Sequence, residues 1–270
     1  MTRFLFWNLN RKPLQSLIAT LAVQHEVDVL IFAECSIEPN VLLQSLREAG
    51  VEYHYLPSAA CKKIEMFTRL APDAFEIIID LDRRIILQLN LPEAKEILLA
   101  ATHFPSKVYW DDASQAAECV ELIRDIRATE QKVGHSRTIL VGDLNMNPFE
   151  SGIVNANALN AVMSQTIARR GFRVIQGTEF PFFYNPMWSF FGDLSPGPPG
   201  TYYYAQSVHK NFFWNMFDQV LIRPDLLSSF SDDDLQILTT IGNTSLLTKT
   251  ERPNVKVASD HLPLLLTLDL

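Results

Sequence analysis

The stretch Thr138-Ile-Leu-Val-Gly-Asp-Leu-Asn145 decides the fold. Its first four residues are mainly apolar and β-branched, which is typical of a short strand buried on both faces. The polar residues Asp143 and Asn145 follow at once, and loops at strand ends are where proteins build their sites. The stretch therefore predicts an internal strand of an α/β protein with chemistry at its end.

Strand and helix patterns alternate over the first 50 residues. Residues 3–9 and 27–33 form short apolar runs that predict buried strands. Between them, leucine and isoleucine recur over residues 14–21 at the spacing of one helix face. A second helix is predicted for residues 41–49, with Gly50 at its end. These elements are the beginning of a βαβ-like arrangement.

The middle of the chain and its last residues read as further strands. From residue 64 to residue 103 apolar and polar residues alternate, most clearly at 75–81 and 87–91, and residues 97–101 follow as an apolar run. The final segment, 264–270, alternates in the same way. Such alternation is typical of antiparallel strands with one face in the core.

A long helix is expected between the strands that end near residue 103 and begin near residue 138. Asp112 and Gln115 resemble a capping box, and apolar residues then mark one face as far as about Gln131. Helices and strands of both orientations predict a mixed α/β sandwich, within a single domain that spans residues 1–270.

Composition limits the class of protein. The chain has 270 residues, 47% of them apolar and 20% charged, which suffices for one large domain with a buried core and argues against disorder. The net charge of −8 disfavours broad attraction to a polyanion, although a bound cation would offset carboxylates in a site. No apolar stretch is long enough for a membrane span. The sequence indicates no protein partner.

Three cysteines lie far apart at Cys35, Cys61 and Cys119. An odd number at wide spacing fits reduced thiols better than a disulfide framework. We therefore expect a cytoplasmic protein. Cys35 follows a candidate site residue, but it is interpreted as a core residue because no histidine is tied to it by a motif.

Residues 180–217 differ from the rest of the chain. They hold 14 of the 28 aromatic residues and five of the 15 prolines. We expect a long loop inserted into the domain, and so many aromatic residues argue against disorder. The candidates for stacking on a base or an acyl chain are Trp188, Tyr202, Tyr203, Tyr204 and Trp214. Packing of the loop onto the sandwich is the competing explanation for most of them.

Four clusters of polar residues follow apolar runs in a fixed order. Each alone is ordinary turn or strand-end sequence. The clusters are Trp7-Asn8-Leu9-Asn10, Ala33-Glu34, Gly142-Asp143-Leu144-Asn145 and Ser259-Asp260-His261. Together with Thr102-His103 and with Asp218 inside a late hydrophobic strand, they resemble the endonuclease/exonuclease/phosphatase family. The resemblance covers essentially the whole chain.

The resemblance implies a fold and a metal. The family's fold is a four-layer sandwich of two mixed β-sheets flanked by helices, which agrees with the patterns above. Glu34 would be the principal metal ligand, with Asn10 and Asp260 near the metal. Mg²⁺ suits such a site because it prefers oxygen ligands and retains several waters, and Mn²⁺ could replace it. Because many members have Asp where this chain has Asn10, we expect a single ion.

The resemblance also implies catalytic roles. Asp143 and Asn145 would position the attacking water and the phosphate oxygens. His261 would stabilise the phosphate, and Asp218 would orient His261 and favour its protonated form. His103 occurs in the deoxyribonuclease-like and sphingomyelinase-like branches, and two histidines allow acid and base work to be divided.

Other candidates concern substrate contacts and the partner of His103. Asn8 would help to hold the metal or the phosphate, and Glu65 is the nearest carboxylate in sequence that could orient His103. Tyr109 lies where some family members place a tyrosine that contacts phosphate. From the aromatic segment, we take three residues as substrate-binding: Trp188, Tyr203 and Trp214.

These expectations define a function. We expect Mg²⁺-dependent hydrolysis of a phosphate ester, in particular a phosphodiester of nucleic acid or nucleotide. The alternative among enzymes is a phosphatase or a phospholipase C-type hydrolase acting on a phospholipid or a phosphorylated small molecule. The alternative outside enzymes is an inactive binding module that keeps the fold. The presence of every expected polar residue in order argues against the module.

Overall fold

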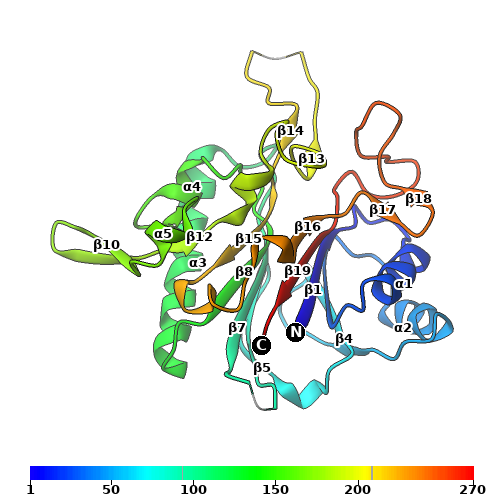
Figure 1. The fold of residues 1–270 in the computed structure, drawn as a ribbon, viewed down its shortest axis with the longest axis horizontal. Coiled ribbons are helices and arrows are strands. Elements are labelled where there is room, and N and C mark those ends of the chain that lie inside the picture. Colours follow the sequence, from blue (N-terminus) through cyan, green and yellow to red (C-terminus); the bar gives the residue numbers. More distant parts are fainter. Residues whose placement is uncertain (93, 208) are drawn as a thin grey trace.

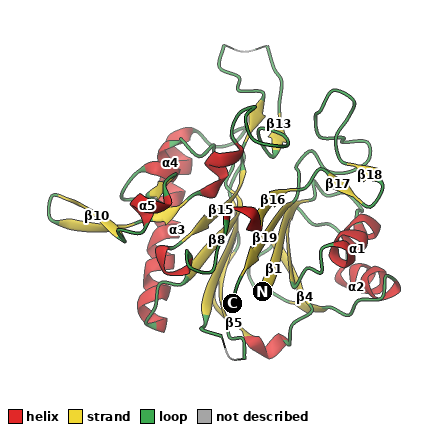
Figure 2. Cartoon of the chain, in the orientation of Figure 1, coloured by secondary structure: helices red, strands yellow, loops and turns green. Residues whose placement is uncertain are grey.

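The computed structural model describes residues 1–92, 94–207 and 209–270. Figure 1 shows two β-sheets face to face, with helices on their outer sides, and Figure 2 shows the same layers by type of secondary structure. Both sheets are mixed. The four-layer sandwich expected from the sequence is therefore confirmed.

The first sheet has six strands in the order β16-β19-β1-β2-β4-β3. They are β1 (Thr2–Asn8), β2 (Val29–Ala33), β3 (His54–Leu56), β4 (Ile64–Thr68), β16 (Leu235–Ile237) and β19 (Leu264–Leu268). β1 pairs in parallel with β2 and antiparallel with β19. The first and last strands of the chain are thus neighbours at the centre of this sheet.

The second sheet has seven strands in the order β5-β6-β7-β8-β15-β12-β9. They are β5 (Phe75–Leu81), β6 (Arg84–Leu89), β7 (Ile97–His103), β8 (Thr138–Asp143), β9 (Ala161–Val162), β12 (Phe183–Tyr184) and β15 (Asp218–Ile222). β7 and β8 are parallel, whereas β15 pairs antiparallel with β8. The strand that decides the fold, β8, lies at the centre, buried along its whole length.

The helices are α1 (Gln15–Gln24), α2 (Pro39–Glu48), α3 (Asp112–Val133), α4 (Ser151–Val154) and α5 (Gln165–Ala168). The 3-10 turns are η1 (Pro72–Ala74), η2 (Pro186–Phe190), η3 (Pro224–Leu226) and η4 (Asp232–Asp234). The cap of α3 differs from the sequence-based expectation. The side chain of Asp111, one residue before Asp112, accepts the hydrogen bond from the Ser114 backbone N–H at 2.8 Å. The two adjacent aspartates made the sequence ambiguous by one position.

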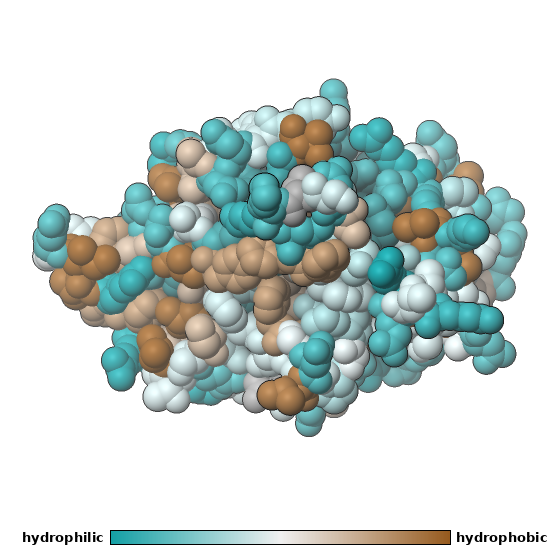
Figure 3. All heavy atoms as spheres, turned by 90° about the horizontal axis from the view of Figure 1, so that it is seen from above, coloured by the Kyte–Doolittle hydropathy of each residue, from teal (hydrophilic) through white to brown (hydrophobic). Residues whose placement is uncertain are grey.

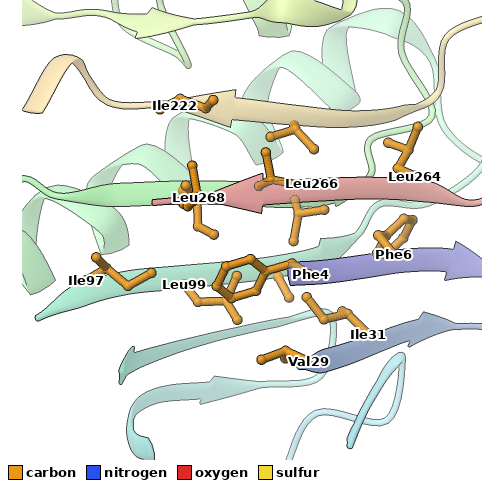
Figure 4. Close-up of a cluster of buried hydrophobic side chains, with 14 of the residues drawn as sticks. Phe4, Phe6, Val29, Ile31, Ile97, Leu99, Ile222, Leu264, Leu266 and Leu268 are labelled. Carbon is orange, nitrogen blue, oxygen red and sulfur yellow. The ribbon is translucent and has the colours of Figure 1, made fainter. Parts of the chain in front are cut away.

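Alternation along β1 explains how the layers are held together. Phe4 and Phe6 point into the core between the sheets, as Figure 4 shows, while Leu5 and Trp7 pack in the outer core under α1 and α2. Side chains of a strand alternate between faces, so a strand with both faces covered must be apolar throughout. Each such buried side chain contributes roughly 1.5–3 kcal/mol to folding. On the other side of the sandwich, β8 places Leu140 in a third cluster beneath α3.

The described residues of the segment 180–217 contain more secondary structure than the long loop expected from the sequence. They include β12, which joins the second sheet, the turn η2, and a hairpin of β13 (Tyr202–Tyr203) and β14 (Trp214–Asn215). Two further hairpins lie outside the sheets: β10 (Phe172–Ile175) with β11 (Thr178–Pro181), and β17 (Thr240–Ile241) with β18 (Thr244–Ser245). Over the described part of the chain, no helix is both long and apolar enough to cross a bilayer.

Candidate active site

Strand register brings the predicted polar residues to one end of the sandwich, which points upward in Figure 1. In the first sheet, Asn8 pairs with Ala33, and Glu34 follows directly. In the second sheet, Asp143 of β8 lies between His103 of β7 and Asp218 of β15. Because β1, β2, β7 and β8 all finish at this end, their last residues from both sheets meet there.

Asn8 links the two sheets. Its side-chain Nδ2 donates to Asp143 Oδ2 at 2.9 Å, and its Oδ1 accepts the Asn10 backbone N–H at 3.0 Å. The Ser259 hydroxyl donates to the Asn8 carbonyl at 2.6 Å. Asn8 is 2% exposed and lines the cleft, and these hydrogen bonds use one of its two amide N–H groups to position Asp143. The expected direct contact of Asn8 with phosphate or metal stays a prediction.

Gly142 allows β7 and β8 to approach closely just before Asp143. A Cβ atom at this position would lie 2.0 Å from the Thr102 carbonyl oxygen, a backbone atom that cannot move away alone. Only glycine fits such an approach without displacing a strand. The glycine of the Gly-Asp-Leu-Asn stretch thus fixes the distance between Asp143 and His103.

His261 and Asp218 form a buried pair. His261 Nδ1 lies 2.8 Å from Asp218 Oδ2, and the Asp218 N–H donates to the Thr201 hydroxyl at 3.1 Å. Burial alone would lower the pKa of His261, but the carboxylates of Asp218, Asp143 and Asp260 outweigh it and raise that pKa to about 10. The imidazole is therefore held as a cation whose other nitrogen, Nε2, lies 4.0 Å from Asp143 Oδ2.

His103 is placed between two carboxylates. Its Nε2 lies 3.7 Å from Glu34 Oε1 and 3.7 Å from Asp143 Oδ2. Its buried Nδ1 has no hydrogen-bond partner among the described residues. Glu65, the carboxylate expected to orient it, instead accepts a hydrogen bond from the Tyr55 hydroxyl at 2.7 Å. Glu65 therefore does not orient His103, because its side chain points along β4 toward β3.

Three candidate site residues have left-handed backbone conformations. The φ angles of Asn10, Glu34 and Asn145 are +47°, +46° and +49°. Asparagine tolerates this region, but glutamate rarely adopts it, and such residues cost roughly 1–3 kcal/mol. Glu34 is held there by its carbonyl, which accepts the Arg11 N–H at 2.9 Å. Strained backbone that the surroundings hold in place is typical of functional positions.

Asn145 and Asp143 form a compact turn. The Asn145 N–H donates to Asp143 Oδ1 at 2.9 Å, and the Asn145 side-chain Nδ2 donates to the Phe104 carbonyl at 2.9 Å. With Asn8 on its other oxygen, the Asp143 carboxylate is held from both sides. Asp143 is 1% exposed, so its remaining lone pairs are directed at whatever enters the site.

An open cleft of about 680 Å³ lies over these groups. Asn10, Glu34 and Asp260 line it with oxygen atoms, and the Arg11 guanidinium lies 3.6 Å from Glu34. Figure 3 views this end from above and shows hydrophobic side chains running between hydrophilic ones. Carboxylate and amide oxygens at a cleft floor fit a hard divalent cation.

A second group of residues could also hold a metal. The ligand atoms of Asp143, Asp218 and His261 all lie within 4.8 Å of one another. His261 Nδ1, however, is already hydrogen-bonded to Asp218, and both side chains are buried. The donor set that faces the cleft, with Glu34 at its centre, therefore suits a hydrated oxygen-loving ion better.

The aromatic candidates divide between this cleft and other places. Trp188 packs on Phe149 at 6.4 Å, and Tyr109 is 84% exposed. Trp214 and Tyr203 contact each other edge-on at 5.5 Å on the far side of their hairpin. None of these four substrate-binding candidates lines the cleft. The aromatic residues that do line it are Tyr202, Tyr204, Phe212 and Phe217.

Among the residues of the site, Tyr202 was considered only as a stacking candidate, whereas Thr201 and Asn147 were absent from the sequence-based set. Tyr202 covers His261 at a ring distance of 4.6 Å, and the Thr201 hydroxyl beside it contacts Asp218. Asn147 donates to Asn215 Oδ1 at 3.0 Å and so ties β14 to the turn after β8. Asn147 could have been found as the third polar residue of the stretch Asp143-Leu-Asn-Met-Asn147. The sequence carries no comparable signal for Thr201.

No model of a known protein family matches this sequence, and no curated protein does either. Solved structures match over the whole chain, and they define the class: the chain has the fold of endonuclease/exonuclease/phosphatase proteins. It is similar to a member of that family from Leptotrichia buccalis, with 13% identity, a TM-score of 0.59 and 100% of both chains covered.

Two other solved structures carry more particular names. The endonuclease domain of TRAS1, a telomere-specific non-LTR retrotransposon, has 16% identity and a TM-score of 0.58, covering 100% of this chain and 99% of that one. ANGEL2, a 2',3'-cyclic phosphatase, has 14% identity and a TM-score of 0.59, covering 100% of this chain and 95% of that one. At this level of identity the likeness establishes the fold.

Proposed function

We propose that this chain hydrolyses a phosphodiester of nucleic acid or nucleotide with the help of a bound divalent cation. The observation that carries the proposal is the position of Asp143. This buried carboxylate lies 3.7 Å from His103 Nε2 and 4.0 Å from His261 Nε2, at the floor of the cleft. A base that lies between two imidazoles and lines the cleft suits in-line attack of water on an ester.

Asp143 would orient the attacking water and accept its proton. Both of its oxygens already accept hydrogen bonds, one from Asn8 and one from the Asn145 N–H. These bonds fix the direction of the carboxylate before substrate arrives, which lowers the cost of organising the reaction. Asn8 and Asn145 therefore act as positioning residues for Asp143.

His261 would stabilise the phosphate as charge develops. Its Nδ1 is occupied by Asp218, so Nε2 is the nitrogen that can donate to a phosphate oxygen. A preorganised cationic donor, itself buried, is the kind of group that favours the transition state over the ground state. His103 would take the second proton-transfer role, at the leaving group or the water.

Glu34, Asn10 and Asp260 would hold the cation, for which we propose Mg²⁺, with Mn²⁺ as a substitute. When bound, such an ion neutralises charge on the phosphate oxygens and on the leaving oxygen. The cleft-facing oxygens and the partial exposure of the Glu34 side chain, 28%, support this assignment over the buried Asp218 pair. A single ion fits the amide at Asn10 better than a second charged site would.

A diester is preferred over the alternatives because of the cleft walls. Tyr202, Tyr204 and Phe212 line the cleft, and aromatic rings stack on nucleobases with roughly 1–3 kcal/mol per base. The neighbours named as an endonuclease and a 2',3'-cyclic phosphatase support the same substrate class. A phosphatase or a phospholipase C-type hydrolase remains the second candidate, because the same floor would accept other phosphate esters.

Product release from a substrate panel tests the proposal. The purified protein would be given Mg²⁺ and, separately, DNA and RNA oligonucleotides, a cyclic dinucleotide, sphingomyelin and an inositol phosphate. We expect turnover of a nucleic acid or nucleotide diester that EDTA abolishes and Mg²⁺ or Mn²⁺ restores. Turnover of the lipid alone would select the second candidate, and a folded protein inert toward the whole panel would favour a binding module.

A matched pair of variants tests the metal assignment. Glu34→Gln should abolish activity at saturating Mg²⁺ with little change in stability, because it removes charge without opening a core cavity. Glu38→Gln is the control, since Glu38 is exposed and lies outside the cleft lining. Near-normal turnover of Glu34→Gln would exclude Glu34 as a ligand.

We also propose a cytoplasmic location, on the state of the cysteines. Cys35, Cys61 and Cys119 are all free thiols. Burial raises the pKa of each thiol, to about 11 for Cys35, so none is poised for reaction. Lysate would be prepared without reductant and treated with a membrane-permeant thiol reagent, before and after denaturation. Labelling of all three cysteines after denaturation would support reduced cysteines in the cell.

A further inference from the structure

A second cleft lies on the other side of the β13–β14 hairpin. It encloses about 320 Å³, and Tyr203, Thr248, Thr250 and Arg252 are among its lining residues. Asp260 lines both this cleft and the one over the candidate active site. The two clefts are thus neighbours that share one wall residue.

Consecutive tyrosines divide between the two clefts. Side chains of a strand alternate in direction, so Tyr202 and Tyr204 face the first cleft while Tyr203 faces the second. In Figure 1 the hairpin stands at the upper end of the sandwich, beside the loops near β17 and β18. A ligand that continues from one cleft into the other would pass beside Asp260.

Arg252 is the main cation of the second cleft. Its guanidinium carbon lies 4.5 Å from the centre of the Tyr203 ring. No carboxylate among the described side chains lies within 4.0 Å of this guanidinium, whereas Arg84 has two such partners and Arg223 has one. A guanidinium that lies over an aromatic ring without a carboxylate partner keeps N–H donors that can bind a phosphate bidentately.

The loop that carries Arg252 is fixed before any ligand binds. The Thr248 N–H donates to the Arg252 carbonyl at 2.8 Å, and the Arg252 N–H donates back to the Thr248 hydroxyl at 3.3 Å. Lys12, from the segment after β1, donates to the Ala258 carbonyl at 2.7 Å and to the carbonyl of Val255, which lines the second cleft. The cleft wall is therefore tied to the same turn that positions the candidate metal ligands.

The charge of this region differs from that of the whole chain. Residues 248–256 contain the cations Lys249, Arg252 and Lys256 against the single acidic residue Glu251, although the chain as a whole carries −8. The first cleft has Glu34 and Asp143 on its floor. Arg252 and Asp260 are the charged residues that line the second cleft, so an anion could bind there through the guanidinium without a metal.

We propose that the second cleft binds the phosphate next to the scissile one, so that the substrate is a single-stranded oligonucleotide. The proposal rests on the proposed phosphodiesterase function and names its substrate class. One phosphate would lie over Asp143 and the following one would bind to Arg252, with the chain passing Asp260. A single strand can follow this path around the hairpin, and bases can stack on Tyr202 and Tyr204.

Comparison of a long and a minimal diester tests this assignment. The substrates are a single-stranded tetranucleotide and bis(4-nitrophenyl) phosphate, each with Mg²⁺. Arg252→Met should lower kcat/KM on the tetranucleotide by roughly tenfold to a hundredfold and leave the small diester unchanged. The slope of log(kcat/KM) against log[salt] should become less steep by about 0.7, since one phosphate contact is lost. Lys249→Met is the matched control, because Lys249 is exposed on the same loop but outside the lining.

The outcomes separate this proposal from the function it rests on. Equal losses on both substrates, or no loss on either, would overturn the second phosphate site while the diesterase stands. A loss seen only with an inositol polyphosphate would also overturn it. If wild-type protein hydrolyses no diester, fluorescence anisotropy with a labelled tetranucleotide decides: weaker binding by Arg252→Met keeps the cleft and rejects the catalytic function, whereas equal binding rejects both.

Discussion

Strand β15 has a buried charged residue at each end, and the two differ in how fully their ion pairs are hydrogen-bonded. Asp218, the first residue, is 0% exposed and pairs with His261 at 2.8 Å. Arg223, directly after the last residue, is 1% exposed and pairs with Glu130 at 2.9 Å. The first pair lies at the candidate active site and the second lies at the other end of the strand.

The Arg223 pair uses almost all of its hydrogen-bonding capacity. The guanidinium donates to both oxygens of Glu130 and, through one nitrogen, to the carbonyls of Pro181 and Phe182 at 3.2 and 3.0 Å. Its carbon lies 4.0 Å from the centre of the Phe183 ring. A buried charge with this many partners stabilises the fold and has nothing left to offer a ligand.

The Asp218 pair and its surroundings leave some hydrogen-bonding groups without a partner. His261 Nε2 makes no hydrogen bond within the described structure, and neither does the buried Nδ1 of neighbouring His103. An unmet buried donor costs stability unless a ligand or water completes it. The comparison teaches that saturation separates a structural ion pair from a reactive one, although both are equally buried.

The largest expected effect is on stability at the structural end. Glu130→Ala leaves Arg223 buried without its counter-charge, which should lower the free energy of unfolding by roughly 3–5 kcal/mol. The kcat of the folded fraction should not change. Urea denaturation and turnover at low temperature check the two statements, with Gln131→Ala, exposed on the same helix, as the control. A loss of kcat in the folded protein would show that the Arg223–Glu130 pair also affects turnover and is not purely structural.

The next effect concerns turnover at the reactive end. His103→Ala and His261→Ala should each lower kcat by roughly 10²-fold or more. The double variant should lose much less than the product of the two, because groups that act as one unit are not additive. His54→Ala, an exposed histidine, is the control. Full kcat in His103→Ala beside an inactive His261→Ala would remove the two-histidine assignment.

A smaller loss should follow when only the partner of the imidazole changes. Asp218→Asn keeps the size of the side chain but weakens the cationic form of His261. We expect kcat to fall by roughly tenfold to hundredfold, less than for His261→Ala, as is usual for a residue that orients a reacting group. Thermal unfolding should change little, because the imidazole can lose its proton once the Asp218 carboxylate is gone, and no buried charge is then left unpaired. A loss of several kcal/mol of stability would make this pair structural like that of Arg223.

The smallest effect involves a carboxylate paired with neutral donors. Asp80 on β5 accepts hydrogen bonds from the Ser58 hydroxyl and from the N–H groups of Ala59 and Cys61. Burial raises the pKa of Asp80, but these hydrogen bonds outweigh it and hold that pKa below its usual value. Asp80→Asn should therefore lower the free energy of unfolding by about 1–3 kcal/mol at neutral pH.

The pH dependence of that effect has a definite sign. A carboxyl whose folded pKa is depressed stabilises the protein above its unfolded pKa, near about 4, and loses this contribution as pH falls through the folded value. The difference between wild type and Asp80→Asn should thus shrink on acidification in denaturation curves. A constant difference from neutral to acid pH would show that the hydrogen bonds do not depend on charge.

The sequence predicted the layers well because they depend on local periodicity. β1, β8 and α3 follow from apolar spacing that any buried strand or helix must have. The polar residues at strand ends were found for the same reason, since Glu34 and Asp143 follow apolar runs directly. Their meeting at one place needed the parallel pairing of β1 with β2 and of β7 with β8, which the resemblance to a family suggested.

Other features depend on pairing that the sequence does not reveal. The hairpin register of Tyr203 with Trp214 decides which tyrosines face the first cleft. Tyr203 was taken as substrate-binding from the sequence, but its neighbours Tyr202 and Tyr204 are the tyrosines that line this cleft. Glu65 is near His103 only along the chain, and β4 directs it to Tyr55. The Arg223 pair also joins residues far apart in sequence, so no local pattern indicated it.

The pairing of β1 with β19 has a consequence for how the protein forms. Thr2 pairs with Leu268, so the central strand of the first sheet waits for a segment that lies far along the chain. Contacts this distant in sequence close slowly, and a nascent chain leaves an apolar strand edge open until β19 has been made. Asn8 and His261 come from these two late-meeting segments. Catalytic competence would therefore arise only with the final steps of folding, after the second sheet has had time to assemble.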